Sequence, residues 1–230
     1  MEESIGAVPK HIGFIMDGNG RWAKARKKPR TFGHQKGADV IEEVVSACFS
    51  RGVEAVSLYA FSTENWSRPK EEVDKIFDLL RKFLSRYSKK LIDEKIRLVI
   101  SGELFALPGE LRTECEKRML ATKDFTGKTL NIAINYGSRA EIVRAMNLLK
   151  NKEGEITEED VSSRLYTAGL PDIDLVVRTS GEQRLSNFFL WQCAYAEFYF
   201  TDVLWPDFHE KELIDALMWF SHRKRRFGGV

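Results

Sequence analysis

The stretch His11-Ile-Gly-Phe-Ile-Met-Asp-Gly-Asn-Gly-Arg-Trp22 leads from apolar residues directly into a carboxylate, two glycines and an arginine. The apolar residues 12–16 are typical of a strand that is covered on both faces, as strands of parallel sheets are. Asp17 therefore falls where the chain leaves the sheet. In open parallel sheets ligands bind beyond this end of the strands, so the stretch indicates both a fold and a site.

The residues after this strand have the chemistry of a site for diphosphate and magnesium. Gly18 and Gly20 let backbone N–H groups approach an anion closely, and Arg21 adds a charged fork. Asp17 can hold a hard cation between its carboxylate and phosphate oxygens. The same residue types are common in turns, and on their own they fit a simple chain reversal equally well.

The composition is typical of a globular protein with one sizeable domain. The chain has 230 residues, of which 43% are hydrophobic and 30% are charged. No stretch approaches the roughly 20 apolar residues that span a bilayer. Residues 1–10 lack the apolar centre of a signal peptide, so we expect a cytoplasmic protein. We expect residues 1–9 to be flexible and residues 223–230 to form a C-terminal tail.

The charges and the cysteines exclude several classes of protein. A net charge of +2 argues against a nucleic-acid partner, although residues 223–226 form a local basic patch. The three cysteines are odd in number and lie far apart among apolar neighbours. A disulfide framework or a zinc site is therefore not expected, and buried thiols are the better interpretation of Cys48, Cys115 and Cys193.

Strands alternate with amphipathic helices along the whole chain, without repeats or a domain linker. We expect strands at 12–16, 53–60, 96–101, 130–135, 175–178 and 197–200. We expect helices at 34–51, 73–87, 108–122, 139–150, 157–168 and 207–222, and a polar loop at 61–69. This order predicts a single α/β domain over residues 1–230, in which helices flank a mainly parallel six-stranded central sheet.

Polar residues stand at the ends of four of these strands. They are Asp17, residues 61–62, Asn135 and Arg178. Because the carboxyl ends of parallel strands meet at one edge of a sheet, we expect these residues to share one rim.

A helix next to this rim combines a polar start with an apolar stripe. His34 opens it, and Ala38, Ile41 and Val45 continue the same face. A charged rim with an apolar stripe leading away suits an amphiphile that has a charged head and a hydrocarbon chain. Such a stripe also fits an ordinary core-facing helix, so periodicity alone leaves both interpretations open.

Several long motifs, in order, resemble those of the cis-prenyltransferases, most closely the bacterial branch that makes undecaprenyl diphosphate. The resemblance covers the chain from the opening stretch to the C-terminus and lowers the weight of the simple turn. One departure is Ser180, where many relatives have glycine. The matching segments are 11–24, 32–34, 58–69, 131–137, 174–182, 186–192 and 194–207.

The resemblance implies an enzyme that condenses isopentenyl diphosphate onto an allylic diphosphate such as farnesyl diphosphate. The product would be a long-chain Z-polyprenyl diphosphate, with undecaprenyl diphosphate expected. It also implies Mg2+ as cofactor and a homodimer. Because the product is a long hydrocarbon, we expect peripheral contact with the inner face of the membrane for product release. A non-catalytic subunit of this fold, or a protein that only binds lipid diphosphates, is the alternative.

The resemblance also assigns roles to individual residues. Those matching the family's allylic site and its mobile loop are Gly18, Asn19, Gly20, Arg21, Trp22, Arg30, His34, Ser62, Glu64, Trp66 and Arg68. Those matching its isopentenyl diphosphate site are Arg178, Arg184 and Ser186. Those matching its catalytic residues, including candidates for proton transfer, are Asp17, His34, Ser62 and Asn65.

The remaining expectations concern metal, dimer and chain length. Asp17 and Glu197 match the family's metal-binding carboxylates, Glu197 also matching a role in the neighbouring subunit's site. The terminal Arg226 and Gly228 resemble an element that reaches a diphosphate across the dimer. Residues expected to line a hydrophobic tunnel are Ala38, Ile41 and Leu79. Residues expected at the dimer interface are 198–200 and Trp205.

Overall fold

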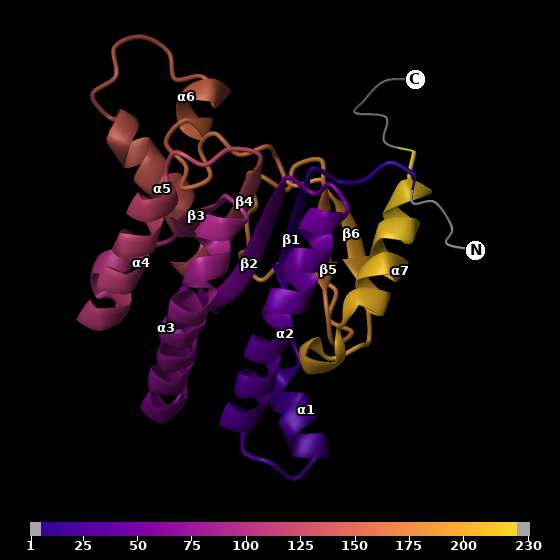
Figure 1. Ribbon diagram of the computed structural model, residues 1–230. Helices are drawn as coiled ribbons and strands as arrows, with labels where there is room; N and C mark the ends of the chain where they lie inside the picture. Colours follow the sequence, from indigo (N-terminus) through magenta and orange to yellow (C-terminus); the bar gives the residue numbers. More distant parts are fainter. Residues whose placement is uncertain (1–5, 225–230) are drawn as a thin grey trace.

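The computed structural model of the protein describes residues 6–224. Within that range six strands form one sheet in the order β3-β4-β2-β1-β5-β6, and every pairing between neighbours is parallel. This confirms the expected α/β fold with a parallel six-stranded sheet. The strands in Figure 1 are β1 (His11–Ile15), β2 (Ala55–Ser62), β3 (Ile96–Ser101), β4 (Lys128–Tyr136), β5 (Leu175–Arg178) and β6 (Glu197–Phe200).

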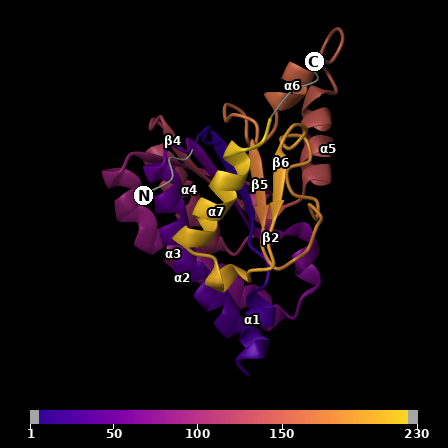
Figure 2. The same ribbon diagram turned by 90° about the vertical axis from the view of Figure 1, so that its right-hand side faces the viewer.

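Helices cover both faces of the sheet. In Figure 2 the helices α2, α3, α4 and α7 lie on one side of the strands, and α5 and α6 lie on the other. The α-helices are α1 (Asn19–Ala25), α2 (Arg30–Ser50), α3 (Lys70–Asp93), α4 (Gly109–Thr122), α5 (Ser138–Leu149), α6 (Glu158–Ser162) and α7 (Glu210–Ser221). Short 3-10 helices are η1 (Thr63–Ser67), η2 (Leu104–Ala106) and η3 (Trp205–Asp207).

The strand β1 lies inside the sheet and is covered on both faces. All five of its residues are buried, between β2 and β5. A Cβ added to Gly13 would lie 2.9 Å from the ring of Phe188, so the close contact of the covering loop depends on that glycine. Phe14 packs on the other face against Trp205 and Phe208. The strand therefore delivers Asp17 to a fixed position at its carboxyl end.

A hydrogen-bonded polar chain crosses the buried sheet. His11 donates from Nδ1 to the carbonyl of Pro171 at 2.7 Å and accepts at Nε2 from the Ser57 hydroxyl at 2.7 Å. Asn131 donates to Ser57 Oγ and accepts from the Ser101 hydroxyl, both at 2.9 Å. Because each buried polar group has a partner, the network fixes the register of four strands without an unpaired group. His11 is thus a structural residue.

Four expected element boundaries were wrong. The helix α1 was missed, because Gly18 and Gly20 read as turn residues; in the structure Gly18, with a φ of 107°, precedes the helix directly. The helix expected from residue 34 begins at Arg30, and the loop 61–69 contains η1. The helix expected at 157–168 ends at Ser162, where Ser163 Oγ binds the carbonyl of Asp160.

The prediction of buried thiols is confirmed, since Cys48, Cys115 and Cys193 are free and buried. Among the helices of residues 6–224, none has the length and apolar character to cross a bilayer. The expected C-terminal element at Arg226 and Gly228 lies outside the described residues, as do residues 1–5.

Candidate active site

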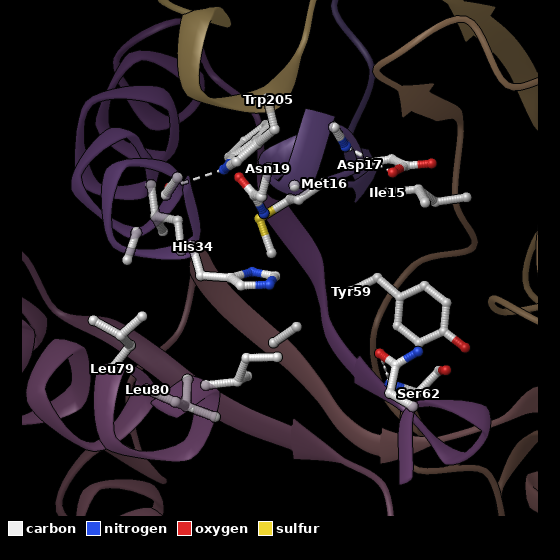
Figure 3. Close-up of a pocket in the computed structure, with 18 of the residues that line it drawn as sticks. Ile15, Met16, Asp17, Asn19, His34, Tyr59, Ser62, Leu79, Leu80 and Trp205 are labelled. Atoms are coloured by element: carbon white, nitrogen blue, oxygen red, sulfur yellow. Dashed lines mark hydrogen bonds between the residues drawn. The ribbon is translucent and has the colours of Figure 1, made fainter. Parts of the chain in front are cut away.

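A cavity of about 270 Å³ opens at the carboxyl ends of β1, β2 and β5, between α2 and α3 (Figure 3). Most of the sequence-predicted site residues line it, although they come from segments far apart in the chain. Those residues are Asp17, Gly18, Asn19, Gly20, Arg30, His34, Ala38, Ile41, Ser62, Asn65, Leu79, Arg68, Arg178 and Ser186. The prediction that polar strand ends share one rim is confirmed for Asp17, Ser62 and Arg178.

Backbone contacts on three sides hold Asp17 in place. Its N–H donates to the hydroxyl of Thr179 at 3.0 Å, and that hydroxyl donates to the Asp17 carbonyl at 2.6 Å. The N–H of Trp205 donates to the same carbonyl at 3.0 Å. The side chain remains 34% exposed, so its carboxylate is fixed in direction and accessible from the cavity. Sequence reasoning missed Thr179, although it directly follows the strand-end Arg178.

The Asp17 carboxylate is paired with arginine. Oδ2 lies 3.1 Å from Nη2 of Arg178 and 3.7 Å from Nη2 of Arg21, while Oδ1 accepts from the Gly18 N–H at 2.6 Å. Arg21 also contacts Ser180 Oγ and lies 3.5 Å from Glu182. Asp17 is thus paired with the guanidinium of Arg178, which lines the cavity, and with that of Arg21, which is itself shared with Glu182.

Arg178 is buried and has an unused donor. Its Nη1 binds the carbonyl of Arg184 and, at 2.8 Å, the hydroxyl of Ser186. Its Nε has no hydrogen-bond partner among the described residues, although the side chain is only 4% exposed. A buried donor left unpaired costs free energy, so its presence beside a cavity is typical of a site that receives an anionic ligand.

A carboxylate that nothing in the sequence singled out organises the opposite wall. Glu72 lies in the first turn of α3 with its side chain 9% exposed, and it contacts Arg30, His34 and Arg68. Burial raises the pKa of Glu72, but the hydrogen bond from His34 and the two guanidinium charges outweigh it, so the pKa lies below its ordinary value. Burial lowers the pKa of His34 and outweighs the attraction of Glu72, so the imidazole is neutral at pH 7.

The far half of the cavity is apolar. Ala38 and Ile41 of α2 face Leu79, Leu80 and other apolar residues of α3 across it. Figure 3 shows the side chains of Leu79 and Leu80 on the side away from Asp17, with the His34 ring between the two halves. A molecule with an anionic head and a hydrocarbon tail matches both ends of the cavity.

The segment around η1 is tied down at both ends. Asn65 Oδ1 accepts from the backbone N–H of Ser62 at 3.2 Å, which closes a capping box. Trp66 donates to Asn135 Oδ1 at 2.8 Å, and Asn187 donates to Glu64 at 3.0 Å. Ser62 and Asn65 therefore line the cavity, whereas Glu64 and Trp66 are held by contacts beside it. Tyr59, which also lines the cavity, was missed by sequence reasoning because it reads as an ordinary strand aromatic.

Three residues lie where the sequence did not lead us to expect them. Trp22 is 8% exposed, stacks on Phe32 and donates to Asp207 at 2.6 Å, so it packs the base of α1 and does not line the cavity. Trp205 is 1% exposed and donates to the carbonyl of Gly37 at 2.8 Å, which excludes it from an exposed dimer interface. Arg184 directs its guanidinium to Glu182 and is 60% exposed.

Glu197 does not join Asp17 within one chain. It pairs in register with Leu175 at the amino end of β6, whereas Asp17 lies beyond the carboxyl end of β1. Its carboxylate binds Arg223 at 2.9 Å. Asp17 and Glu197 therefore do not meet within one subunit, and a role of Glu197 with metal or in a neighbouring subunit's site stays a prediction.

The donors present suit a magnesium ion that takes most of its ligands from a substrate. Among residues 6–224 no group of three or more His, Cys, Asp or Glu side chains converges. Of the described residues that line the cavity, Asp17 is the only one with a carboxylate. Mg2+ retains waters and binds through one or two carboxylates plus phosphate oxygens, so a single carboxylate fits this ion when a diphosphate is present.

The fold and the cavity together define a parallel α/β protein whose cavity, at the carboxyl ends of its strands, has a charged rim and an apolar wall. Residues 15–228 match the family model described as "Putative undecaprenyl diphosphate synthase". An isoprenyl transferase of Bacillus cereus (strain ATCC 14579) is 50% identical, over 100% of this chain and 92% of the relative. The chain therefore belongs to the undecaprenyl diphosphate synthase family of prenyltransferases.

Two further relatives carry the names of different prenyl diphosphate synthases. A ditrans,polycis-undecaprenyl-diphosphate synthase of Aliivibrio fischeri, named as specific for (2E,6E)-farnesyl diphosphate, is 47% identical over 98% of this chain and 90% of its own. The crystal structure of lavandulyl diphosphate synthase from Lavandula x intermedia, in complex with dimethylallyl diphosphate, superposes with a TM-score of 0.92. It is 34% identical, over 96% of this chain and 98% of that chain.

Proposed function

We propose that the protein condenses isopentenyl diphosphate units onto farnesyl diphosphate and releases a long-chain Z-polyprenyl diphosphate, undecaprenyl diphosphate. The observation that carries the proposal is the continuity of the cavity, in which a rim with Asp17, Arg30, Arg68 and Arg178 leads directly to an apolar wall between α2 and α3. The farnesyl-specific relative from Aliivibrio fischeri supports the same primer and product.

The allylic diphosphate is proposed to bind between Asp17 and the wall formed by Arg30, His34 and Arg68. Breaking its carbon–oxygen bond separates an allylic cation from a highly charged diphosphate. Donors that already point at the departing oxygens stabilise that charge without reorganising during the reaction. Arg30 and Arg68 supply such donors, and the backbone N–H groups after Gly18 supply further ones.

The isopentenyl diphosphate is proposed to bind at Arg178 and Ser186. Arg178 and Ser186 both line the cavity, and Ser186 Oγ lies 2.8 Å from Nη1 of the arginine, so a charged group and a hydroxyl lie side by side for a phosphate oxygen. Holding this second diphosphate would keep its alkene beside the allylic cation, which replaces a random encounter by an oriented one. The Arg184 guanidinium binds Glu182 and does not line the cavity, so its part in this grip requires a rearrangement of that side chain.

Magnesium held by Asp17 and phosphate oxygens would neutralise charge on the departing diphosphate. The carbocation that forms when isopentenyl diphosphate adds to the allylic cation must then lose a proton. His34 is neutral and donates Nε2–H to Glu72, which leaves Nδ1 as its basic nitrogen. We propose His34 and Ser62 as the carriers of this proton, with the diphosphate or Asp17 as acceptor.

The homodimer and the membrane contact remain proposals. The edge strand β6 leaves the aromatic run 198–200 half-buried, which is consistent with a second copy beside it. The walls at Ala38, Ile41 and Leu79 are proposed to continue as the tunnel that accommodates the growing chain.

The test is incubation with farnesyl diphosphate, labelled isopentenyl diphosphate and Mg2+, followed by sizing of the extracted lipid. We expect a polyprenyl product of eleven isoprene units as in undecaprenyl diphosphate, and none with EDTA or with Asp17→Ala. If the protein binds farnesyl diphosphate without consuming isopentenyl diphosphate, it is a lipid-diphosphate-binding protein and the proposal fails.

A further inference from the structure

Glu72 occupies an unusual place for a carboxylate, beside a cavity that is to receive anions. It is the third residue of α3 and its side chain is buried, whereas the preceding Glu71 is exposed. A buried carboxylate is costly unless it is paired and hydrogen-bonded. The partners that satisfy this condition for Glu72 are side chains of the cavity wall.

Three side chains that line the cavity converge on this carboxylate. Oε1 accepts from Nε2 of His34 at 3.1 Å and from Nη1 of Arg68 at 3.2 Å. Arg30 donates from Nη2 to Oε1 at 3.4 Å, and its Nε lies 3.2 Å from Oε2 as an ion pair. His34 and Arg30 come from α2, and Arg68 comes from the segment before α3. Glu72 therefore joins two helices as well as three donors.

The two arginines depend on Glu72 for their positions. Arg30 is 61% exposed and Arg68 is 31% exposed, and each long side chain loses conformational entropy when it is held in one place, so a partner is needed to hold it there. The Arg30 guanidinium also lies 3.1 Å from the position of a Cβ on Gly20. Glu72 thus holds Arg30 against the glycine turn that follows Asp17.

Glu72 also determines which nitrogen of His34 is basic. An ionised carboxylate only accepts hydrogen bonds, so Nε2 must carry a proton and the neutral ring has its lone pair at Nδ1. One buried carboxylate thereby fixes the position of two cations and the tautomer of a neutral ring on the same wall.

We propose that Glu72 is the positioning residue of the allylic diphosphate site, holding Arg30, Arg68 and His34 in the arrangement that binds the diphosphate. The inference rests on the proposed function and deepens it. Positioning and simple charge predict opposite changes in diphosphate affinity for a Glu72→Gln variant. Replacing Glu72 by glutamine removes a negative charge near an anion, which by electrostatics alone would tighten binding. If Glu72 positions the three donors, the same substitution weakens binding of the diphosphate.

The experiment compares Glu72→Gln with Glu71→Gln, which makes the same charge change one residue earlier in the first turn of α3. Binding of farnesyl thiodiphosphate, in which sulfur replaces the bridging oxygen, is measured by calorimetry with Mg2+. Steady-state rates give KM for farnesyl diphosphate and for isopentenyl diphosphate separately. Glu72→Asp, which keeps the charge but shortens the reach, serves as a second variant, and thermal unfolding monitors folding.

We expect Glu72→Gln to raise the Kd of the thio-analogue and the KM of farnesyl diphosphate about tenfold, with less than a threefold change in the KM of isopentenyl diphosphate. Glu72→Asp should follow it, and Glu71→Gln should match the wild type. Unchanged or tighter binding of the thio-analogue overturns the inference, and so does an equal loss for both substrates. If the wild type makes no polyprenyl product but Glu72→Gln still weakens the thio-analogue, the proposed function fails and the inference stands.

Discussion

Lowering the pH should destabilise the protein through His11. Burial lowers the pKa of this imidazole from 6.5 to about 4, although the hydrogen bond to Pro171 and the charge of Asp174 act in the opposite direction. The unfolded chain binds a proton at His11 near pH 6.5, whereas the folded protein binds it only near pH 4. Between these values the unfolded state holds more protons, so stability falls as the pH falls.

The size of the effect follows from the two pKa values. Each pH unit in this window corresponds to about 1.4 kcal/mol, so acidification from pH 6.5 to pH 4 should remove about 3 kcal/mol. This is a large part of the roughly 5–15 kcal/mol that stabilises a typical domain. Above pH 6.5 both states carry a neutral His11, and its contribution no longer depends on pH.

Urea unfolding followed by circular dichroism at pH 7.5, 6.5, 5.5 and 4.5 measures this loss. The free energy of unfolding of the wild type should fall more steeply below pH 6.5 than that of His11→Gln, by about 1.4 kcal/mol per pH unit. Carboxylates titrate in both proteins and cancel in the comparison. His222→Gln, at an exposed position, is the control and should keep the wild-type slope. Equal slopes for the wild type and His11→Gln would refute the reasoning.

Three further substitutions test the site and its packing. Asp17→Ala should lower turnover by several orders of magnitude, each tenfold being about 1.4 kcal/mol of barrier, while farnesyl thiodiphosphate still binds. Incorporation of labelled isopentenyl diphosphate measures the turnover. Near-normal turnover would exclude Asp17 from the mechanism. Ala38→Leu narrows the apolar wall and should shorten the products on thin-layer chromatography, whereas an unchanged length distribution would count against the proposed tunnel. In Gly37→Ala the new Cβ would lie 2.2 Å from Oδ1 of Asn19, so urea unfolding should show a loss of about 1–3 kcal/mol. Gly109→Ala, with open space around its Cβ, should show no such loss.

The sequence predicted the parts of this protein that depend on hydrophobic pattern. The central strand before Asp17 and the stripe through Ala38 and Ile41 are regular enough to give the sheet, its rim and the apolar wall. Parallel pairing then brings strand ends together whatever their separation in the chain. The position of Glu197 could have been deduced in the same way, since the first residue of a parallel strand lies at the end opposite the rim.

The sequence could not predict contacts that only the packed helices create. Glu72 stands in an acidic first turn, a pattern typical of a solvated helix start, and only the packing of α2 on α3 buries it. Trp22 was misjudged for a related reason: the glycines that indicate an anion-binding turn also begin α1, which turns the indole toward Phe32 and Asp207. In both cases burial depended on a neighbour remote in the chain.

The two ends of the sheet differ in how the backbone is held. Positive φ angles at non-glycine residues gather around the cavity end, in Asn135, Ser180, Ser186, Asn187 and Phe189. Such conformations cost of order 1–3 kcal/mol each and persist only where the surroundings hold them. Of these residues, Ser186 places its hydroxyl 2.8 Å from the Arg178 guanidinium at the end of β5, and both residues line the cavity. At buried positions of the same sheet, hydrogen bonds join His11, Ser57, Asn131 and Ser101, so the four strands that carry them are held in register.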